Sequence, residues 1–188
     1  GSAGRHMAAT IAIDPIVEAH ALLVDIEYPD GVQELTEYLA AKVAELNAFE
    51  PVAMDIFATY SDFEVTSQVF YLIGTAYGAL ANMYFRVPVP EGLPDSVEET
   101  FRTGMQDGAA PLLESALQRL DAVVNLSEAQ GFSSEWVDLA MALRAELKPG
   151  TYSAEKRETF GVAATQYVPT APPRSQSFER VGDDDGEE

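Results

Sequence analysis

The side chains that could carry chemistry in this chain are one histidine and many carboxylates. His20 lies among Ala19, Ala21 and Leu22 in a stretch with helical spacing, and the chain has no cysteine. A zinc site or a general base needs companions at suitable spacing, such as a second His or a Cys. His6 belongs to a stretch that looks like a vector remnant, so the sequence supplies His20 with acids only. We therefore predict a structural or surface role for His20.

The acidic stretches do not match a calcium loop. "DIEYPDG" (25–31) and "DDDGEE" (183–188) place carboxylates close together. A calcium loop alternates its ligands over about twelve residues and closes with a glutamate, which neither stretch does. We predict no bound metal, no cofactor and no catalytic residues. Most acids fall on helix positions expected to face solvent, including Glu34, Glu37, Glu45, Glu98 and Glu99.

Motifs that mark common enzyme classes are missing from the sequence. It contains no P-loop, no G-x-G-x-x-G after a strand, no G-x-S-x-G and no H-E-x-x-H. Paired carboxylates could still hydrolyse glycosides, since any acid-rich chain offers such pairs. We favour a non-enzymatic binding module. The alternative is a small all-α enzyme that uses carboxylates, with or without a divalent metal.

Composition limits the class of partner. The 188 residues are 47% hydrophobic and carry a formal net charge of -20, with no cysteine for disulfides. Such a charge argues against nucleic acid and against anionic membrane as direct partners. No unbroken apolar run of about 20 residues suggests a transmembrane helix. We interpret 1–7, "GSAGRHM", as a vector remnant, 8–162 as one α-helical domain and 163–188 as a disordered acidic tail.

Apolar residues at helical spacing predict an all-α fold with six or seven helices. Asp14 and Pro15 suit a helix start, and Pro51 suits another. Pro111 and the glycines before it should kink or split a long helix. No stretch alternates strictly between hairpin turns. The expected helices are 14–26, 32–49, 51–60, 64–87, 96–130, 133–147 and 153–161.

Three helix ends also have sequence signals. Asp95 or Ser96 is expected to cap the long helix, and Gly131 is expected to end it. Ser133 or Ser134 is expected to cap the helix that follows.

Two glycines interrupt the most apolar segment, "FYLIGTAYGAL" (70–80). Gly74 and Gly78 should each cost about 1 kcal/mol relative to alanine inside a helix. We expect Gly74 to let another helix pack closely. We expect Gly78 to lie toward the opposite, groove-facing edge, where a bulky side chain is excluded.

The segment resembles the first helix of a tetratricopeptide repeat. Phe70, Ile73, Gly74 and Tyr77 follow its W-x-x-L-G-x-x-Y spacing, and a similar pattern starts at Trp136. The resemblance implies stacked helical hairpins in a degenerate repeat array. The two signatures lie about twice as far apart as the roughly 34 residues of a repeat, so a plain helical bundle is the alternative. We expect one buried cluster made of Trp136, Leu139, Ala116 and Leu120.

A longer resemblance covers 70–160. A long helix, the loop "PVPEGL", a helix containing "APLLESA", a Gly-aromatic turn, a Trp helix and "LKP" follow one another in this order. The order is similar to that in tetratricopeptide-type proteins of the δ-proteobacterial cell-envelope and gliding-motility machinery. This resemblance implies a periplasmic scaffold for protein partners within a multiprotein complex. A cytoplasmic acidic adaptor is the alternative.

In such repeats the first helices line a concave groove that holds the partner. Helical spacing places Gln68, Tyr71 and Thr75 opposite the packing residues of the first signature helix. Met141 and Arg144 take equivalent positions on the Trp136 helix. Aromatic residues, Met and Arg are enriched at protein interfaces. We predict that these five residues contact a protein partner.

Overall fold

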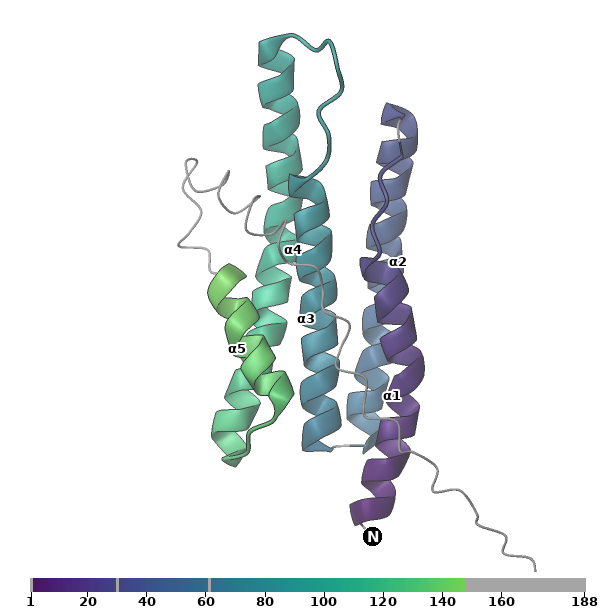
Figure 1. The fold of residues 1–188 in the computed structure, drawn as a ribbon, viewed down its shortest axis with the longest axis vertical. Coiled ribbons are helices and arrows are strands. Elements are labelled where there is room, and N and C mark those ends of the chain that lie inside the picture. The colour runs from purple at the N-terminus through teal and green to yellow at the C-terminus, as the bar shows by residue number, and fades with distance from the viewer. Residues whose placement is uncertain (1, 30, 61, 148–188) are drawn as a thin grey trace, which may run out of the picture.

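The computed structural model describes residues 2–29, 31–60 and 62–147, and it confirms the all-α prediction for them. Five helices follow one another in this part of the chain (Figure 1): α1 Ser2–Val24, α2 Val32–Tyr60, α3 Phe63–Phe85, α4 Asp95–Gln130 and α5 Glu135–Leu147. The helix expected at 153–161 and the tail expected at 163–188 lie outside the described residues.

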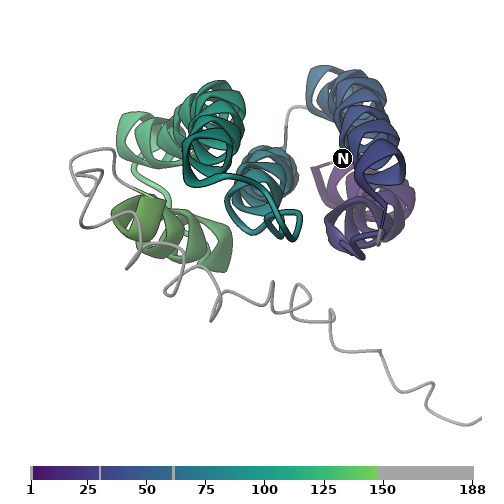
Figure 2. The same cartoon turned by 90° about the horizontal axis from the view of Figure 1, so that it is seen from above.

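Helix α3 is the centre of the molecule and contacts each of the other four helices. The α1–α2 pair lies on one side of it, and α4 and α5 lie on the other (Figures 1 and 2). Buried side chains form two hydrophobic clusters that meet at α3. We call them the N-terminal cluster, centred on Leu46, Leu72 and Ile73, and the C-terminal cluster, centred on Ala116, Leu120 and Ala140.

Two prolines do not mark helix starts as predicted. Pro51 lies inside α2, so the helices expected at 32–49 and 51–60 are one, and Pro15 lies inside α1. Helix α4 runs through Pro111 as one helix over the range expected for it, and the described residues hold five helices. An interior proline costs about 3 kcal/mol because it removes a hydrogen bond and clashes with the preceding turn. All three rings are on exposed positions, where a helix can curve outward to relieve the clash. Buried residues on both sides of each proline hold the helix together.

Helix α1 begins at Ser2, so Asp14 is not its N-cap. The expected cap of α4 is also wrong. The N-cap position is Pro94, and neither Asp95 nor Ser96 precedes the helix. Helix α3 does have a side-chain N-cap. There the carboxylate of Asp62 accepts a hydrogen bond from the Val65 amide at 3.1 Å.

The turn between α4 and α5 matches the sequence in part. Gly131 ends α4 in the left-handed conformation at φ 69°, and its amide donates to the Ser127 carbonyl at 2.8 Å. Helix α5 starts after Ser134, as expected, and the Ser134 carbonyl accepts from the Val137 amide at 3.1 Å. The Ser134 hydroxyl oxygen makes no hydrogen bond within the described residues, so it does not cap the helix.

The glycines of α3 explain how α4 packs. A Cβ at Gly74 would lie 2.9 Å from Leu120 Cδ2 and 3.4 Å from the Ala116 carbonyl oxygen, so the close approach predicted at Gly74 is confirmed. The prediction for Gly78 is wrong, because Gly78 is buried and faces the same helices. A Cβ there would lie 3.5 Å from Leu147 Cδ1 and 4.0 Å from Ala116 Cβ. Residues four apart share one face of a helix, which is the reason.

The core around α5 is rotated from the predicted one. Ala116 and Leu120 are buried in the C-terminal cluster, as expected. From α5, however, Val137, Ala140, Leu143 and Leu147 join them, while Leu139 is only half-buried. The Trp136 side chain is buried beside that cluster and packs against Tyr71, with 5.6 Å between ring centroids. The Trp signature therefore identified the helix and the buried positions Trp136, Ala140 and Leu143, but not Leu139.

Helix α1 has an unusual balance of apolar length and burial. Gly4–Val24 is long and apolar enough to cross a membrane by length and composition, which corrects the expectation that no segment is. Asp14 and Glu18 interrupt the apolar run, but the segment as a whole is apolar. A core helix of a soluble protein or a signal sequence passes the same test. Only 28% of this apolar stretch is buried in the structure.

Candidate binding groove between α1 and α2

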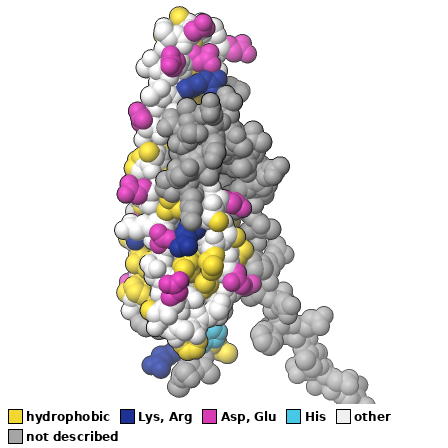
Figure 3. Space-filling view, turned by 90° about the vertical axis from the view of Figure 1, so that its left-hand side faces the viewer, with side chains coloured by type: hydrophobic (Ala, Val, Ile, Leu, Met, Phe, Trp, Pro, Cys, Tyr) yellow, Lys and Arg dark blue, Asp and Glu magenta, His cyan; other side chains and the backbone are white. Residues whose placement is uncertain are grey.

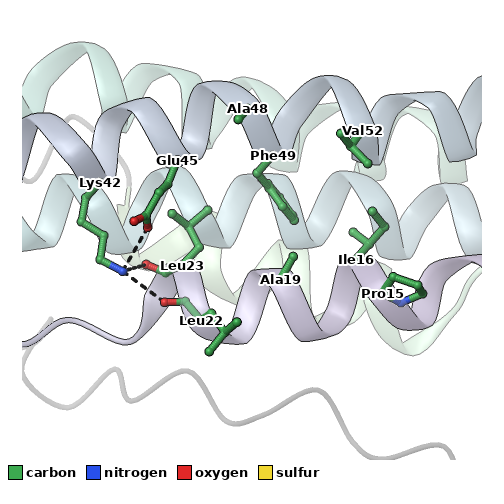
Figure 4. Close-up of a pocket in the computed structure, with 10 residues that line it drawn as sticks. All are labelled: Pro15, Ile16, Ala19, Leu22, Leu23, Lys42, Glu45, Ala48, Phe49 and Val52. Carbon is green, nitrogen blue, oxygen red and sulfur yellow. Dashed lines mark hydrogen bonds and ion pairs between the residues drawn. The ribbon is translucent and has the colours of Figure 1, made fainter.

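An open groove of about 580 Å³ runs between α1 and α2. Figure 4 shows the two helices side by side, with the side chains of Ile16, Leu23 and Phe49 between them. Apart from Lys42 and Glu45, the groove is apolar. The lining residues are Pro15, Ile16, Ala19, Leu22, Leu23, Lys42, Glu45, Ala48, Phe49 and Val52.

The rims of the groove carry large apolar side chains in contact with solvent. Leu22 on α1 is 73% exposed and Val52 on α2 is 58% exposed. Between them, Ile16, Leu23 and Phe49 are buried and form the floor. This arrangement leaves an apolar concave surface that a further segment of protein could cover.

The groove exists because α1 is apolar on more than one face. Ile13 and Ile16 point into the N-terminal cluster, whereas Ile11 and Leu22 are exposed. A helix that only needed to cover the core would carry one apolar stripe. The exposed apolar residues of α1 therefore exceed what packing on α2 and α3 requires.

Lys42 lies at one end of the groove, and its ammonium group binds to groups of this chain. Its ammonium donates to the carbonyls of Leu22 at 3.1 Å and Leu23 at 3.3 Å, and lies 3.3 Å from a carboxylate oxygen of Glu45 (Figure 4). Helix α1 has no basic residue in its own last turn. Lys42 thus satisfies the terminal carbonyls of α1, where a helix favours positive charge.

A buried polar chain lies behind the floor of the groove. The ring of His20 is 6.2 Å from that of Phe49, and its Nε2 is 2.7 Å from the Thr75 hydroxyl oxygen. The Thr75 hydroxyl donates to the Leu72 carbonyl at 2.9 Å, so its oxygen accepts from His20 Nε2–H. Burial lowers the pKa of His20 to about 4, which keeps the ring neutral near pH 7. This agrees with the predicted structural role of His20.

A second polar network joins the two sides of α3. Glu50 of α2 forms an ion pair with Arg119 of α4 and accepts a hydrogen bond from the Tyr77 hydroxyl of α3 at 2.6 Å. Burial, followed by the hydrogen bond to Glu50, raises the pKa of Tyr77 to about 12. The sequence had marked Tyr77 as a packing residue only, and nothing in it linked Glu50 to Arg119. This network ties α2 to α4 across the central helix.

The five residues predicted to contact a partner do not form one open face. Thr75 is buried and bonded to His20, so it is closed to a partner in this conformation. Gln68 and Tyr71 are half-buried, and Tyr71 packs on Trp136. The reason is that α3 is surrounded by helices and has no free side, unlike the first helix of a hairpin that lines a groove.

On α5, the predicted residues remain accessible. Met141 is 49% exposed, and Arg144 pairs with Asp121 of α4 at 2.9 Å. Figure 3 views the molecule from the side of α4 and α5 and shows acidic side chains scattered among apolar and polar ones. The prediction that Met141 and Arg144 contact a partner is not tested by this geometry.

Sequence reasoning did not find the α1–α2 groove. A signal was present, since Leu22 and Ile11 lie on a helix whose other apolar residues already suffice for a core. These residues can be recognised as surplus to the core only once the helices that pack against α1 are known. Among the described residues, no group of three or more His, Asp or Glu side chains could hold a metal ion.

Comparison with known protein families, with curated proteins and with solved structures finds no match to this chain.

Proposed function

We propose that this protein is a non-enzymatic protein-interaction module whose α1–α2 groove holds a segment of a partner protein. The observation that carries the proposal is the pair of exposed apolar rims, Leu22 and Val52, above a buried apolar floor. Apolar patches of this kind, bordered by charge, are typical of interaction sites. Burying the two rim side chains would contribute about 1.5–3 kcal/mol each in favour of binding if both became fully covered.

The setting of the proposal follows from the family resemblance. The consecutive pairs α1–α2 and α3–α4 are consistent with degenerate, repeat-like hairpins, as the tetratricopeptide pattern suggests. The similarity of 70–160 to cell-envelope proteins supports a partner within an envelope-associated complex in the periplasm.

The test is site-specific photo-crosslinking in cells that encode the protein. A photoreactive residue at Leu22 should capture a protein that one at Val97 does not. Val97 is a suitable control because it is an apolar residue on α4 that is 46% exposed. The captured protein is identified from its crosslinked peptide and then purified and recombined with the full chain.

Binding between the purified partner and the full chain then tests the proposal. Leu22→Glu and Val52→Glu should each abolish binding, and Val97→Glu should leave it intact, with all three variants keeping the parent helicity. Equal binding by all three variants would show that the groove is not the site. Loss of binding with Tyr71→Ala/Arg144→Ala alone would move the site to the α3–α5 surface.

A further inference from the structure

We propose that the occupant of the groove is a basic amphipathic helix of another protein. This inference rests on the proposed function and adds the shape and charge of the partner. It follows from the dimensions of the groove, from the backbone chemistry of its walls and from the charges along its rims.

The groove fits a short helix. From Pro15 to Leu23 it extends about 12 Å along α1, and from Lys42 to Val52 about 15 Å along α2, at about 1.5 Å per helical residue. These lengths correspond to two or three helical turns. A helix of that length presents anchors at positions i, i+3 or i+4, and i+7, the spacing used by partners that dock as a helix in a groove.

An extended peptide is a poor fit because the walls offer it few backbone partners. Both walls are helices, whose interior amide and carbonyl groups bond within the helix, apart from the carbonyls that lose their donor at Pro15 and Pro51. The carbonyls that α1 leaves open at its end, Leu22 and Leu23, are already bonded to Lys42. An extended segment would therefore place unpaired backbone groups on an apolar floor, at a cost of about 1–3 kcal/mol each. A helix satisfies its own backbone and avoids this cost.

The rims carry unpaired negative charge. Glu18 is three residues after Pro15 and four before Leu22, which places it on the α1 rim by helical spacing. Asp55 continues the α2 rim three residues after Val52. Both are exposed, and neither forms a hydrogen bond or ion pair within the described residues. Glu45 adds a third carboxylate, with its side chain 54% exposed.

Among the described residues of α1 and α2, no Lys or Arg near the groove is free to balance these carboxylates. Lys42 is committed to the α1 carbonyls and to Glu45. The other Lys or Arg on α1 and α2 is Arg5, about three turns before Pro15. Charge complementarity therefore favours a partner with Lys or Arg beside its apolar anchors.

The same charges count against the two occupants that this chain itself could supply. A second copy carries the same formal net charge of -20 and would bring carboxylates to carboxylates. The chain's own residues after Leu147 also contain more acidic than basic side chains. Like charges brought together across an interface oppose association.

The experiment uses two synthetic probes with one apolar pattern. Both peptides carry Leu at i, i+3, i+4 and i+7. One has Lys at the remaining charged positions and the other has Glu. Binding of each fluorescein-labelled peptide to the full chain is measured by anisotropy at low and at physiological salt. The Lys peptide should bind at least tenfold tighter than the Glu peptide, and the gap should shrink as salt rises.

Variants with the same change in net charge at different positions show whether the groove rims attract the Lys peptide. Glu18→Lys/Asp55→Lys should weaken the Lys peptide about three- to tenfold and strengthen the Glu peptide. Glu99→Lys/Asp107→Lys makes the same change in net charge at exposed positions on α4, and should have a clearly smaller effect. Leu22→Ala/Val52→Ala should weaken both peptides, and Val97→Ala neither.

Each alternative result overturns the inference. Equal effects of the two charge-reversal variants would mean that the whole acidic surface, rather than the groove, attracts the peptide. Equal binding of both peptides would show that the partner need not be basic. Failure of the Lys peptide to bind would rule out a basic amphipathic helix as the occupant of the groove. A Leu22 photo-crosslink to 148–188 of the same chain or to a second copy would name a different occupant. The proposed function is decided separately, by the reconstituted partner.

Discussion

The two faces of α3 are packed by different means. Toward α1 and α2 it presents large aliphatic side chains, such as Leu72, Ile73 and Leu80. Toward α4 and α5 it presents Gly74, Gly78 and Ala81, so that Leu120 and Ala116 approach its backbone. Large side chains fill space between helices but hold them apart, whereas small residues bring backbones into contact.

Buried polar groups sharpen this contrast. Within the described part of the chain, each buried polar or charged residue lies on α1, α2 or α3: His20, Lys42, Thr66, Ser67 and Thr75. The C-terminal cluster is built from apolar residues. Of the buried polar or charged residues, His20, Lys42 and Thr75 form hydrogen bonds on the N-terminal side, which also has the open groove. A partner that completes the core is therefore expected on the N-terminal side.

The largest expected effect tests whether the two clusters unfold together. Leu46 is fully buried in the N-terminal cluster, and Leu46→Ala should lower the free energy of unfolding by about 3–5 kcal/mol. Because α3 belongs to both clusters, urea midpoints from circular dichroism and from Trp136 fluorescence should shift by the same amount. Trp136 is the only tryptophan and reports on the C-terminal side. An unchanged fluorescence midpoint would show that the two sides unfold independently.

Acid should destabilise the N-terminal side through His20. The pKa of His20 is lowered from 6.5 to about 4 by burial, so the unfolded state binds the extra proton between these values. The free energy of unfolding should fall by about 1.4 kcal/mol per pH unit as pH drops from about 6.5 toward 4, or about 3 kcal/mol in all. His20→Gln, which can still donate to Thr75, should remove this contribution. Parallel pH profiles for parent and variant between pH 5 and 6.5 would contradict the expectation.

Breaking the link between the two sides should have an intermediate effect. Arg119→Met leaves the Glu50 carboxylate partly buried without its ion pair. Removing one partner of a fully buried pair costs about 3–5 kcal/mol, and the residual exposure of both side chains here lowers the expected loss to about 2 kcal/mol. The double variant Glu50→Gln/Arg119→Met should recover part of the loss in urea unfolding. A double variant less stable than Arg119→Met would mean that Glu50 is not left unpaired by the single change.

The smallest expected effect compares the two glycines of α3. Gly74→Ala should destabilise by about 1 kcal/mol, because its Cβ would press on Leu120 and on the Ala116 carbonyl, and the gain in helix propensity offsets only part of the strain. Gly78→Ala has ordinary contact distances to Leu147 and Ala116 and should stabilise by up to about 1 kcal/mol. Thermal melting of the two variants separates these expectations, and the same sign for both would contradict them.

Sequence reasoning predicted the features that depend on local patterns. Helical spacing identified the all-α fold, the approximate ends of α3 and the turn at Gly131. It failed at Pro15 and Pro51, where packing on both sides of each ring holds a helix that local propensity would end. On α5 it expected Leu139 in the buried cluster, where Val137 lies instead, because both are apolar and spacing alone does not choose between them.

Patterns within the sequence predicted that the chain is helical, that Gly74 of α3 admits a neighbouring helix, and that the chain is strongly acidic. These properties follow from spacing, side-chain size and composition, which act over a few residues or over the whole chain. Only the tertiary structure decided which faces are covered. Thr75 is inaccessible to a partner because the other helices pack against α3. Glu50 meets Arg119 because α2 and α4 both pack on α3. Leu22 is exposed to solvent because nothing among the described residues packs over it. Burial depends on contacts between segments far apart in the chain, and the periodicity of one helix does not contain them.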